Sequence, residues 1–177
     1  MNKSIREVVG DLSVVTTIMA LTLLGMSAGW AQQKAGDLKQ RLVGTWLVVS
    51  QYVDQEGKKV EPFGSNPKGV FMFDRSGHLS IIIMRSGLPK IASNNRLKAT
   101  PEENKAIAEG IVAYYGTYTV NEKDGSLSVK VDGSSYPNWG GEIQKRMITI
   151  KGDEMKLVNP TAAIGGGSVH VVLKRAK

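Results

Sequence analysis

The chain has 177 residues, a formal net charge of +7 and no cysteine. This length fits one domain and is enough to bury a hydrophobic core without disulfide bridges. The missing cysteines exclude disulfides, thiolate metal sites and thiol nucleophiles. The basic residues are scattered and form no continuous basic block, which argues against a nucleic-acid partner.

The N-terminal segment has the layout of a secretory signal peptide. Lys3 and Arg6 precede a stretch without charge over residues 12–31, and the sequence "GWA" at 29–31 fits the small-x-small rule for cleavage. An uncleaved membrane anchor is the alternative, because about twenty uncharged residues are just long enough to cross a bilayer. We expect cleavage.

The chain is therefore expected to contain three segments of different kinds. We predict an exported domain, periplasmic or secreted, which contacts a membrane only if the first segment stays uncleaved. The segments are a signal peptide at 1–31, a linker at 32–40 and a globular domain at 41–177.

Beyond the linker, apolar and polar residues alternate with a period of two, which is typical of half-buried β-strands. Turn signals such as "RSG" at 75–77 and "KDG" at 123–125 separate the alternating runs. The pattern predicts about eight strands. They lie at 42–53, 69–74, 78–85, 114–120, 126–132, 143–150, 154–158 and 168–175.

One helix is predicted between the strands at 78–85 and 114–120. Thr100 is suited to the N-cap, Pro101 to the first helical position and Glu103 to the capping box. The helix is expected to end at about residue 113. Its two adjacent glutamates are explained by the helix dipole and need no catalytic role.

Short antiparallel strands in sequence close most economically into an up-and-down barrel, because closure removes the unpaired edges. We therefore predict an all-β fold, an eight-stranded barrel with one inserted helix, whose interior has room for side chains or one small ligand. Gly44 lets the first strand bend close to its neighbours. Trp46 then fills the narrow end of the barrel or serves as an ordinary core aromatic.

Several motifs follow one another along residues 41–175. They are "LVGTWLVVSQYVDQEGKKVEPFG", "KGVFMFDRSGHLSIIIMR", "YYGTYTV", "YPNWGGEIQKRMITIKGDEMKLVNP" and "VVLKR". In content and order they resemble the lipocalin-like domain family of bacteria and fungi, and the "GTW" at 44–46 matches the G-x-W of lipocalins. The resemblance implies a barrel with a central cavity and a basic residue, Arg175 or Lys174, packed across Trp46. It implies no single activity, and Leu173 stands where an aromatic residue is expected.

Alternation along the strands assigns side chains to the inside or the outside of the barrel. If Trp46 faces inward, strict alternation also turns Val48, Ser50 and Tyr52 inward. On the strand at 114–120 the same reasoning turns Tyr114 and Tyr118 inward.

The strand at 78–85 is apolar on both faces, so it contributes either Met84 with Ile82 or Ile83 with Ile81 to the cavity. The connection "YPNWGG" offers Tyr136, Asn138 and Trp139 at one end of the barrel. These loop residues either bind a ligand or, in the case of Trp139, cap the core.

The strand at 143–150 combines a core pair with two polar residues on the same face. If Ile148 and Ile150 face the core, Gln144 and Arg146 face it too. A buried guanidinium is costly without a partner, so Arg146 needs a carboxylate, a carbonyl or a ligand beside it, unless it lies at a solvated rim. The cavity candidates are Tyr52, Met84, Tyr114, Tyr118, Asn138, Trp139, Gln144 and Arg146. The residues expected to close the barrel are Gly44, Trp46 and Arg175.

The sequence shows no pattern typical of a catalytic centre. His78 and His170 lack the spacing of metal ligands, and the S-x-x-K match at 65–68 lies in a proline-containing loop without its partner motifs. There is no nucleophile elbow, phosphate-binding loop or dinucleotide fingerprint. We expect no catalytic residue, no metal and no cofactor.

Three functions fit this fold. The favoured one is an exported carrier that binds a small hydrophobic or amphipathic molecule inside the barrel. An isomerase or cyclase would need groups such as Tyr118 and Arg146 to converge in the cavity. A protein-interaction module of the cell envelope would depend on the basic surface instead.

Overall fold

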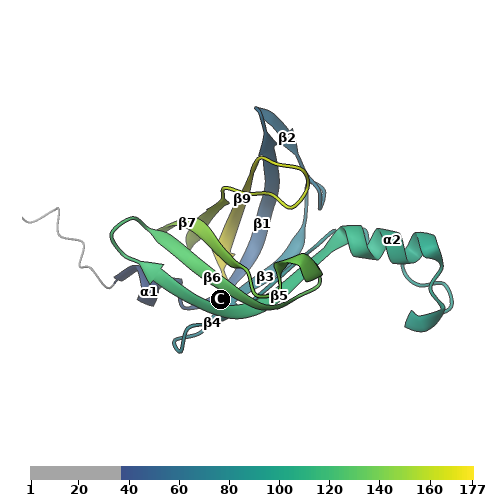
Figure 1. The fold of residues 1–177 in the computed structure, drawn as a ribbon, viewed down its shortest axis with the longest axis horizontal. Coiled ribbons are helices and arrows are strands. Elements are labelled where there is room, and N and C mark those ends of the chain that lie inside the picture. The colour runs from purple at the N-terminus through teal and green to yellow at the C-terminus, as the bar shows by residue number, and fades with distance from the viewer. Residues whose placement is uncertain (1–36) are drawn as a thin grey trace, which may run out of the picture. The chain divides into compact units, whose positions relative to one another are not determined.

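The computed structural model describes residues 37–177, so the expected signal peptide and most of the linker lie outside the described residues. Within this range nine strands form one antiparallel sheet in the order β2-β1-β3-β4-β5-β6-β7-β8-β9, and β1 also pairs with β9. The strands wrap around a common axis (Figure 1). The predicted eight-stranded all-β barrel is thus confirmed, with β2 as a short addition to β1. The strands are β1 (Gly44–Gln55), β2 (Lys58–Val60), β3 (Lys68–Phe73), β4 (His78–Met84), β5 (Ile111–Asn121), β6 (Ser126–Ser134), β7 (Ile143–Lys151), β8 (Glu154–Asn159) and β9 (Ser168–Arg175).

Strand β1 closes the barrel because it pairs along both of its edges. On one edge its first residues pair with β3, from Gly44 opposite Phe73, and its last residues pair with β2. On the other edge it pairs with β9, from Trp46 opposite Arg175 to Asp54 opposite Ser168. The first and last long strands of the barrel therefore lie side by side, and closure removes the exposed edges that an open sheet would have.

The closed end of the barrel is built around Trp46. The indole is fully buried, and its Nε1 donates a hydrogen bond of 2.8 Å to the carbonyl of Leu42. The guanidinium of Arg175 lies 4.1 Å from the centre of the ring and donates to the carbonyls of Val43 and Arg41. Gly44 has a φ of +128°, and a Cβ at this position would come within 2.9 Å of Arg175 Nη1. Glycine is thus required where the backbone passes under the arginine.

Helix α1 (Asp37–Leu42) occupies the end of the expected linker and also residues 41–42, which we expected to belong to the barrel domain. The Glu122 carboxylate accepts hydrogen bonds of 3.0 Å from the backbone N–H groups of both Leu38 and Lys39. At the other end of the helix, Arg41 donates to the carbonyl of Ile150. A helix of six residues is too short for a clear sequence pattern, and these distant contacts supply its stability.

Helix α2 (Pro101–Gly110) begins as predicted and ends earlier than predicted. Thr100 Oγ1 accepts from Glu103 N, and Glu103 Oε2 accepts from Thr100 N, which completes the capping box. The residues after Gly110 leave the helix because they pair with β4, with Ile111 opposite Met84. Two 3₁₀ turns, η1 (Arg96–Lys98) and η2 (Pro137–Trp139), complete the helical elements of the described range. Within residues 37–177 no helix has the length and apolarity needed to cross a membrane.

A β-bulge in β1 reverses the expected facing of its second half. The pairing with β9 shifts register between Val48 and Ser50, and the extra residue inverts the alternation. Gln51 therefore points inward, while Tyr52 lies on the outer face and stacks on the ring of His170 at a centroid distance of 4.7 Å. The prediction that Tyr52 faces the cavity is wrong for this reason.

Strand β4 contributes Ile81 and Ile83 to the core, and both side chains are buried. Met84, on the opposite face, is only half-buried and is absent from the cavity lining. Of the two alternatives for this strand, the one that turned Met84 inward is wrong. Because both faces of β4 are apolar, its sequence does not show which face is turned inward. The pairing of β4 with β3 and β5 determines the inward face.

Candidate ligand-binding cavity

The barrel contains a cavity of about 430 Å³ that runs from buried core residues to exposed residues at the barrel mouth. Its inner part is formed by inward-facing side chains of β1, β3, β4, β5, β7, β8 and β9, among them Val53, Phe71 and Ile83. Its outer part is formed by the end of α2, by η2 and by the loops at 61–67 and 160–167. The lining is mainly apolar, which is typical of small-molecule sites.

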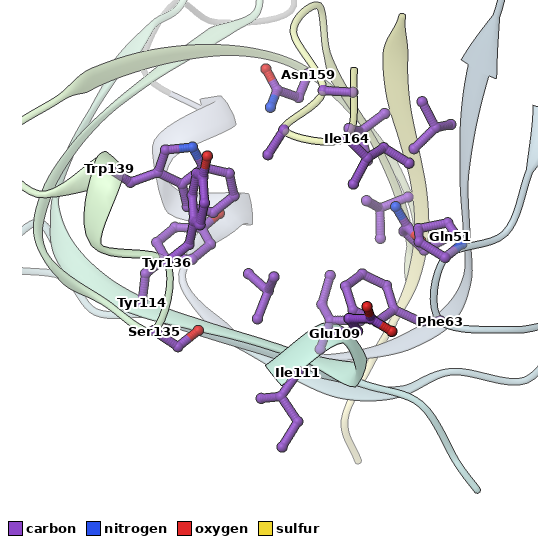
Figure 2. Close-up of a pocket in the computed structure, with 18 of the residues that line it drawn as sticks. Gln51, Phe63, Glu109, Ile111, Tyr114, Ser135, Tyr136, Trp139, Asn159 and Ile164 are labelled. Atoms are coloured by element: carbon purple, nitrogen blue, oxygen red, sulfur yellow. The ribbon is translucent and has the colours of Figure 1, made fainter. Parts of the chain in front are cut away.

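Aromatic side chains form one wall of the cavity. In Figure 2, Tyr114, Tyr136 and Trp139 lie together, with Gln51 and Phe63 across the pocket. The ring of Trp139 makes edge-to-face contacts with Tyr114 at 5.4 Å and with Tyr136 at 5.5 Å between centroids. Such pairs hold flat side chains in fixed orientations, so this wall presents a preorganised aromatic surface.

Arg146 lies next to this wall and is almost completely buried, with 3% of its surface exposed. Its Nη2 donates to Gln144 Oε1 and, over 3.4 Å, to the hydroxyl oxygen of Tyr114. Its Nη1 is buried and has no hydrogen-bond partner among the described residues. No carboxylate of residues 37–177 forms an ion pair with Arg146.

Gln51 is a second buried polar group in the lining, with 4% of its surface exposed. Its Oε1 is buried and receives no hydrogen bond from any described residue. Buried polar atoms are normally paired, so an unpaired acceptor that faces a cavity points to a ligand or to water in that cavity.

The model of a family described as the lipocalin-like domain matches residues 43–175. The chain belongs to this family. Among its relatives, the 4'-hydroxy-3'-methoxypropiophenone carrier protein of Aspergillus oryzae is 34% identical over 95 residues, which cover 49% of this chain and 86% of that protein. A lipocalin-like barrel with an apolar cavity indicates small-molecule binding.

The cavity of this lipocalin-like domain brings together three of the eight residues proposed from the sequence. Tyr114, Trp139 and Arg146 line it, and Gln144 contacts Arg146 from outside the lining. Asn138 is exposed, and its amide donates to the hydroxyl of Tyr136. Besides Asn138 and Gln144, the positions outside the lining are Tyr52, Met84 and Tyr118.

Tyr118 faces inward as predicted, but it lies in the packed part of the barrel. It is buried beside Phe73, and its hydroxyl donates to the backbone carbonyl of Asp74. Burial, together with the nearby charge of Asp74, raises the pKa of the Tyr118 phenol. Tyr118 and Arg146 therefore do not converge in the cavity, and the acid–base pair considered for an isomerase or cyclase is not formed by these two residues.

Several lining residues were missed from the sequence, chiefly Gln51, Phe63, Ile111 and Ile164. Gln51 was assigned to the outer face because the bulge was not foreseen. Phe63 and Ile164 belong to loops, where no periodic pattern indicates the direction of a side chain.

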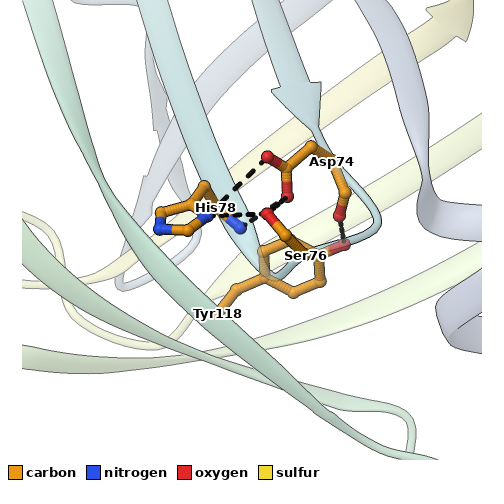
Figure 3. A network of polar contacts seen from close by, with 4 residues as sticks. All are labelled: Asp74, Ser76, His78 and Tyr118. Atoms are coloured by element: carbon orange, nitrogen blue, oxygen red, sulfur yellow. Dashed lines mark hydrogen bonds and ion pairs between the residues drawn. The ribbon is translucent and has the colours of Figure 1, made fainter.

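The turn between β3 and β4 contains an Asp, a Ser and a His, which are the residue types of a catalytic triad (Figure 3). Their hydrogen bonds, however, are local ones within the turn. Ser76 Oγ lies 2.8 Å from both Asp74 Oδ1 and His78 Nδ1, and Asp74 Oδ1 also accepts from the His78 backbone N–H. These hydrogen bonds lower the pKa of Asp74, the backbone bond most of all. All three side chains are exposed on the surface and outside the cavity, so we interpret them as turn-stabilising. Among the described residues, no cluster of three or more His, Asp or Glu side chains could hold a metal ion.

Proposed function

We propose that this protein is an exported carrier that binds one small, mostly apolar molecule in the barrel cavity. The observation that carries the proposal is the apolar cavity of about 430 Å³ enclosed by a barrel that is sealed at one end by Trp46 and Arg175. Each 100 Å² of apolar ligand surface buried there would contribute about 2.5 kcal/mol to binding.

The aromatic wall favours a ligand with an aromatic ring. A flat ring between Trp139 and Phe63 would extend the edge-to-face contacts that already link Trp139 to Tyr114 and Tyr136. The relative from Aspergillus oryzae is named as a carrier of a methoxypropiophenone, which is consistent with an aromatic ligand here. Gln51 Oε1 is placed to accept one hydrogen bond from such a ligand.

Export is the second part of this proposal and is supported by the charge pattern of residues 1–31. The full chain should be expressed and the exported fraction analysed by intact-mass spectrometry. A mature protein that begins at Gln32 is expected. A mass that includes Met1 in that fraction would contradict cleavage.

Binding is tested on the protein purified after expression of the full chain. Native mass spectrometry should reveal a co-purified small molecule, and the neutral fluorescent probe N-phenyl-1-naphthylamine should bind with an increase in emission. The variant Val171→Phe, which places a ring in the cavity, should abolish probe binding. The variant Val172→Phe, on the outer face of the same strand, should retain it. Probe binding that survives in Val171→Phe would show that the cavity is not the site.

A further inference from the structure

The electrostatic balance of the cavity is positive. Arg85, Arg146 and Glu109 are the charged residues in the described lining. Glu109 is exposed at the mouth, with Lys105 Nζ 3.9 Å from its carboxylate, and Arg85 donates to the Pro62 carbonyl over 2.9 Å. The buried part of the cavity thus holds a cation without a protein anion beside it.

The hydrogen-bond partners of Arg146 accept bonds from only some of the N–H groups of its guanidinium. A guanidinium has five N–H donors and remains positively charged at physiological pH. The hydrogen bonds to Tyr114 and Gln144 both come from Nη2 and reach neutral oxygens, while Nη1 has no described partner. A buried charge is stable only when it is paired and hydrogen-bonded. The missing acceptor is therefore to be sought inside the cavity.

We propose that the ligand is an amphipathic acid, whose carboxylate binds Arg146 and whose apolar body fills the cavity. The guanidinium lies beside the aromatic wall, because Tyr114 contacts both Arg146 and Trp139. An acid bound in this way would pair its charge and stack its body on the adjacent rings. This inference rests on the proposed carrier function and adds the chemical class of the ligand.

The experiment compares two probes of the same size and ring system, one an anion and the other a neutral amide. 2-Naphthoate and the neutral 2-naphthamide are titrated against the protein carrying N-phenyl-1-naphthylamine, and their displacement constants are compared. A hydrogen-bonded ion pair with Arg146 should make the acid bind about tenfold or more tightly than the amide. The same comparison is made with Arg146→Met and with Lys145→Met. The second variant removes the same charge from the outer face of the same strand.

Each result is decisive. A preference for the acid that disappears in Arg146→Met and persists in Lys145→Met supports the proposal. Equal affinity for acid and amide in the unmodified protein overturns it and leaves the carrier proposal intact. A preference that persists in Arg146→Met, with circular dichroism showing a folded protein, also overturns it, because the charge would then act from elsewhere. Failure of all three probes to bind overturns the carrier proposal as well.

Discussion

The guanidinium of Arg175 stacks over the ring of Trp46 at 4.1 Å and holds the first and last strands of the barrel together. The same arginine donates to the carbonyls of Arg41 and Val43, just before β1 begins. Three interactions of one side chain thus tie the C-terminal strand to the entry of the first strand. These interactions close this end of the barrel. Neither Trp46 nor Arg175 lines the cavity, which lies elsewhere in the barrel.

Replacing Arg175 with methionine should destabilise the protein by about 2–4 kcal/mol, because a cation–π contact is lost and two backbone carbonyls lose their hydrogen-bond donor. Urea unfolding followed by tryptophan fluorescence measures the change. Lys174→Met is the matched control, since Lys174 is exposed on the same strand, and it should change the free energy of unfolding by less than about 0.5 kcal/mol. Equal effects of both variants would contradict the structural role of Arg175.

Replacing Arg146 with methionine should have little effect on the stability of the ligand-free protein, or should increase it. The substitution removes a buried charge that lacks an anionic partner, and even the replacement of a whole buried ion pair by apolar residues is often neutral or stabilising by about 1–4 kcal/mol. Urea unfolding of the ligand-free protein provides the measurement. A loss of more than about 3 kcal/mol would show that Arg146 has a structural role instead.

Removing an aromatic side chain from the wall of the cavity should weaken probe binding, whereas removing one from the outer face of β1 should not. Trp139→Ala removes a ring from the cavity and should weaken binding of N-phenyl-1-naphthylamine about tenfold. Tyr52→Ala removes a ring from the opposite face and should leave the affinity within about twofold. Fluorescence titration of both variants measures these affinities. A large loss of affinity in Tyr52→Ala would contradict the outward orientation that the bulge gives to Tyr52.

Acid should destabilise the turn between β3 and β4 through Asp74. Its hydrogen bonds to the His78 N–H and to Ser76 lower its pKa in the folded protein. A carboxyl with a lowered folded-state pKa binds fewer protons when folded. It therefore stabilises the protein above its unfolded pKa of about 4 and loses this contribution as pH falls through the folded pKa.

The free energy of unfolding, measured from pH 6 to pH 2.5, should fall less steeply in Asp74→Asn than in the unmodified protein. Asp132→Asn, which changes an exposed carboxylate on β6, is the control and should follow the unmodified curve more closely. Identical slopes for Asp74→Asn and the unmodified protein would contradict the assigned role of Asp74.

The barrel itself was predictable because its signals are local. Each predicted strand is present to within three residues at its ends, since period-two alternation and glycine turns act over a few neighbouring residues. The capping box at Thr100 and Glu103 is a local signal of the same kind. The inward position of Arg146 followed from the parity of Ile148 and Ile150, because β7 contains no bulge in its pairing with β6 or β8.

Only the tertiary structure decided which residues surround the cavity. Gln51 replaced Tyr52 on the inner face because of a bulge, which arises from the pairing of β1 with a strand more than 100 residues away. Phe63 and Ile164 reach the cavity from loops whose paths depend on barrel closure. The sequence by itself determined the strands, their order and the glycine and tryptophan of the closed end, because short-range patterns encode them. The register between distant strands, and with it the composition of the site, emerges only when the barrel closes and long-range pairing overrides local alternation.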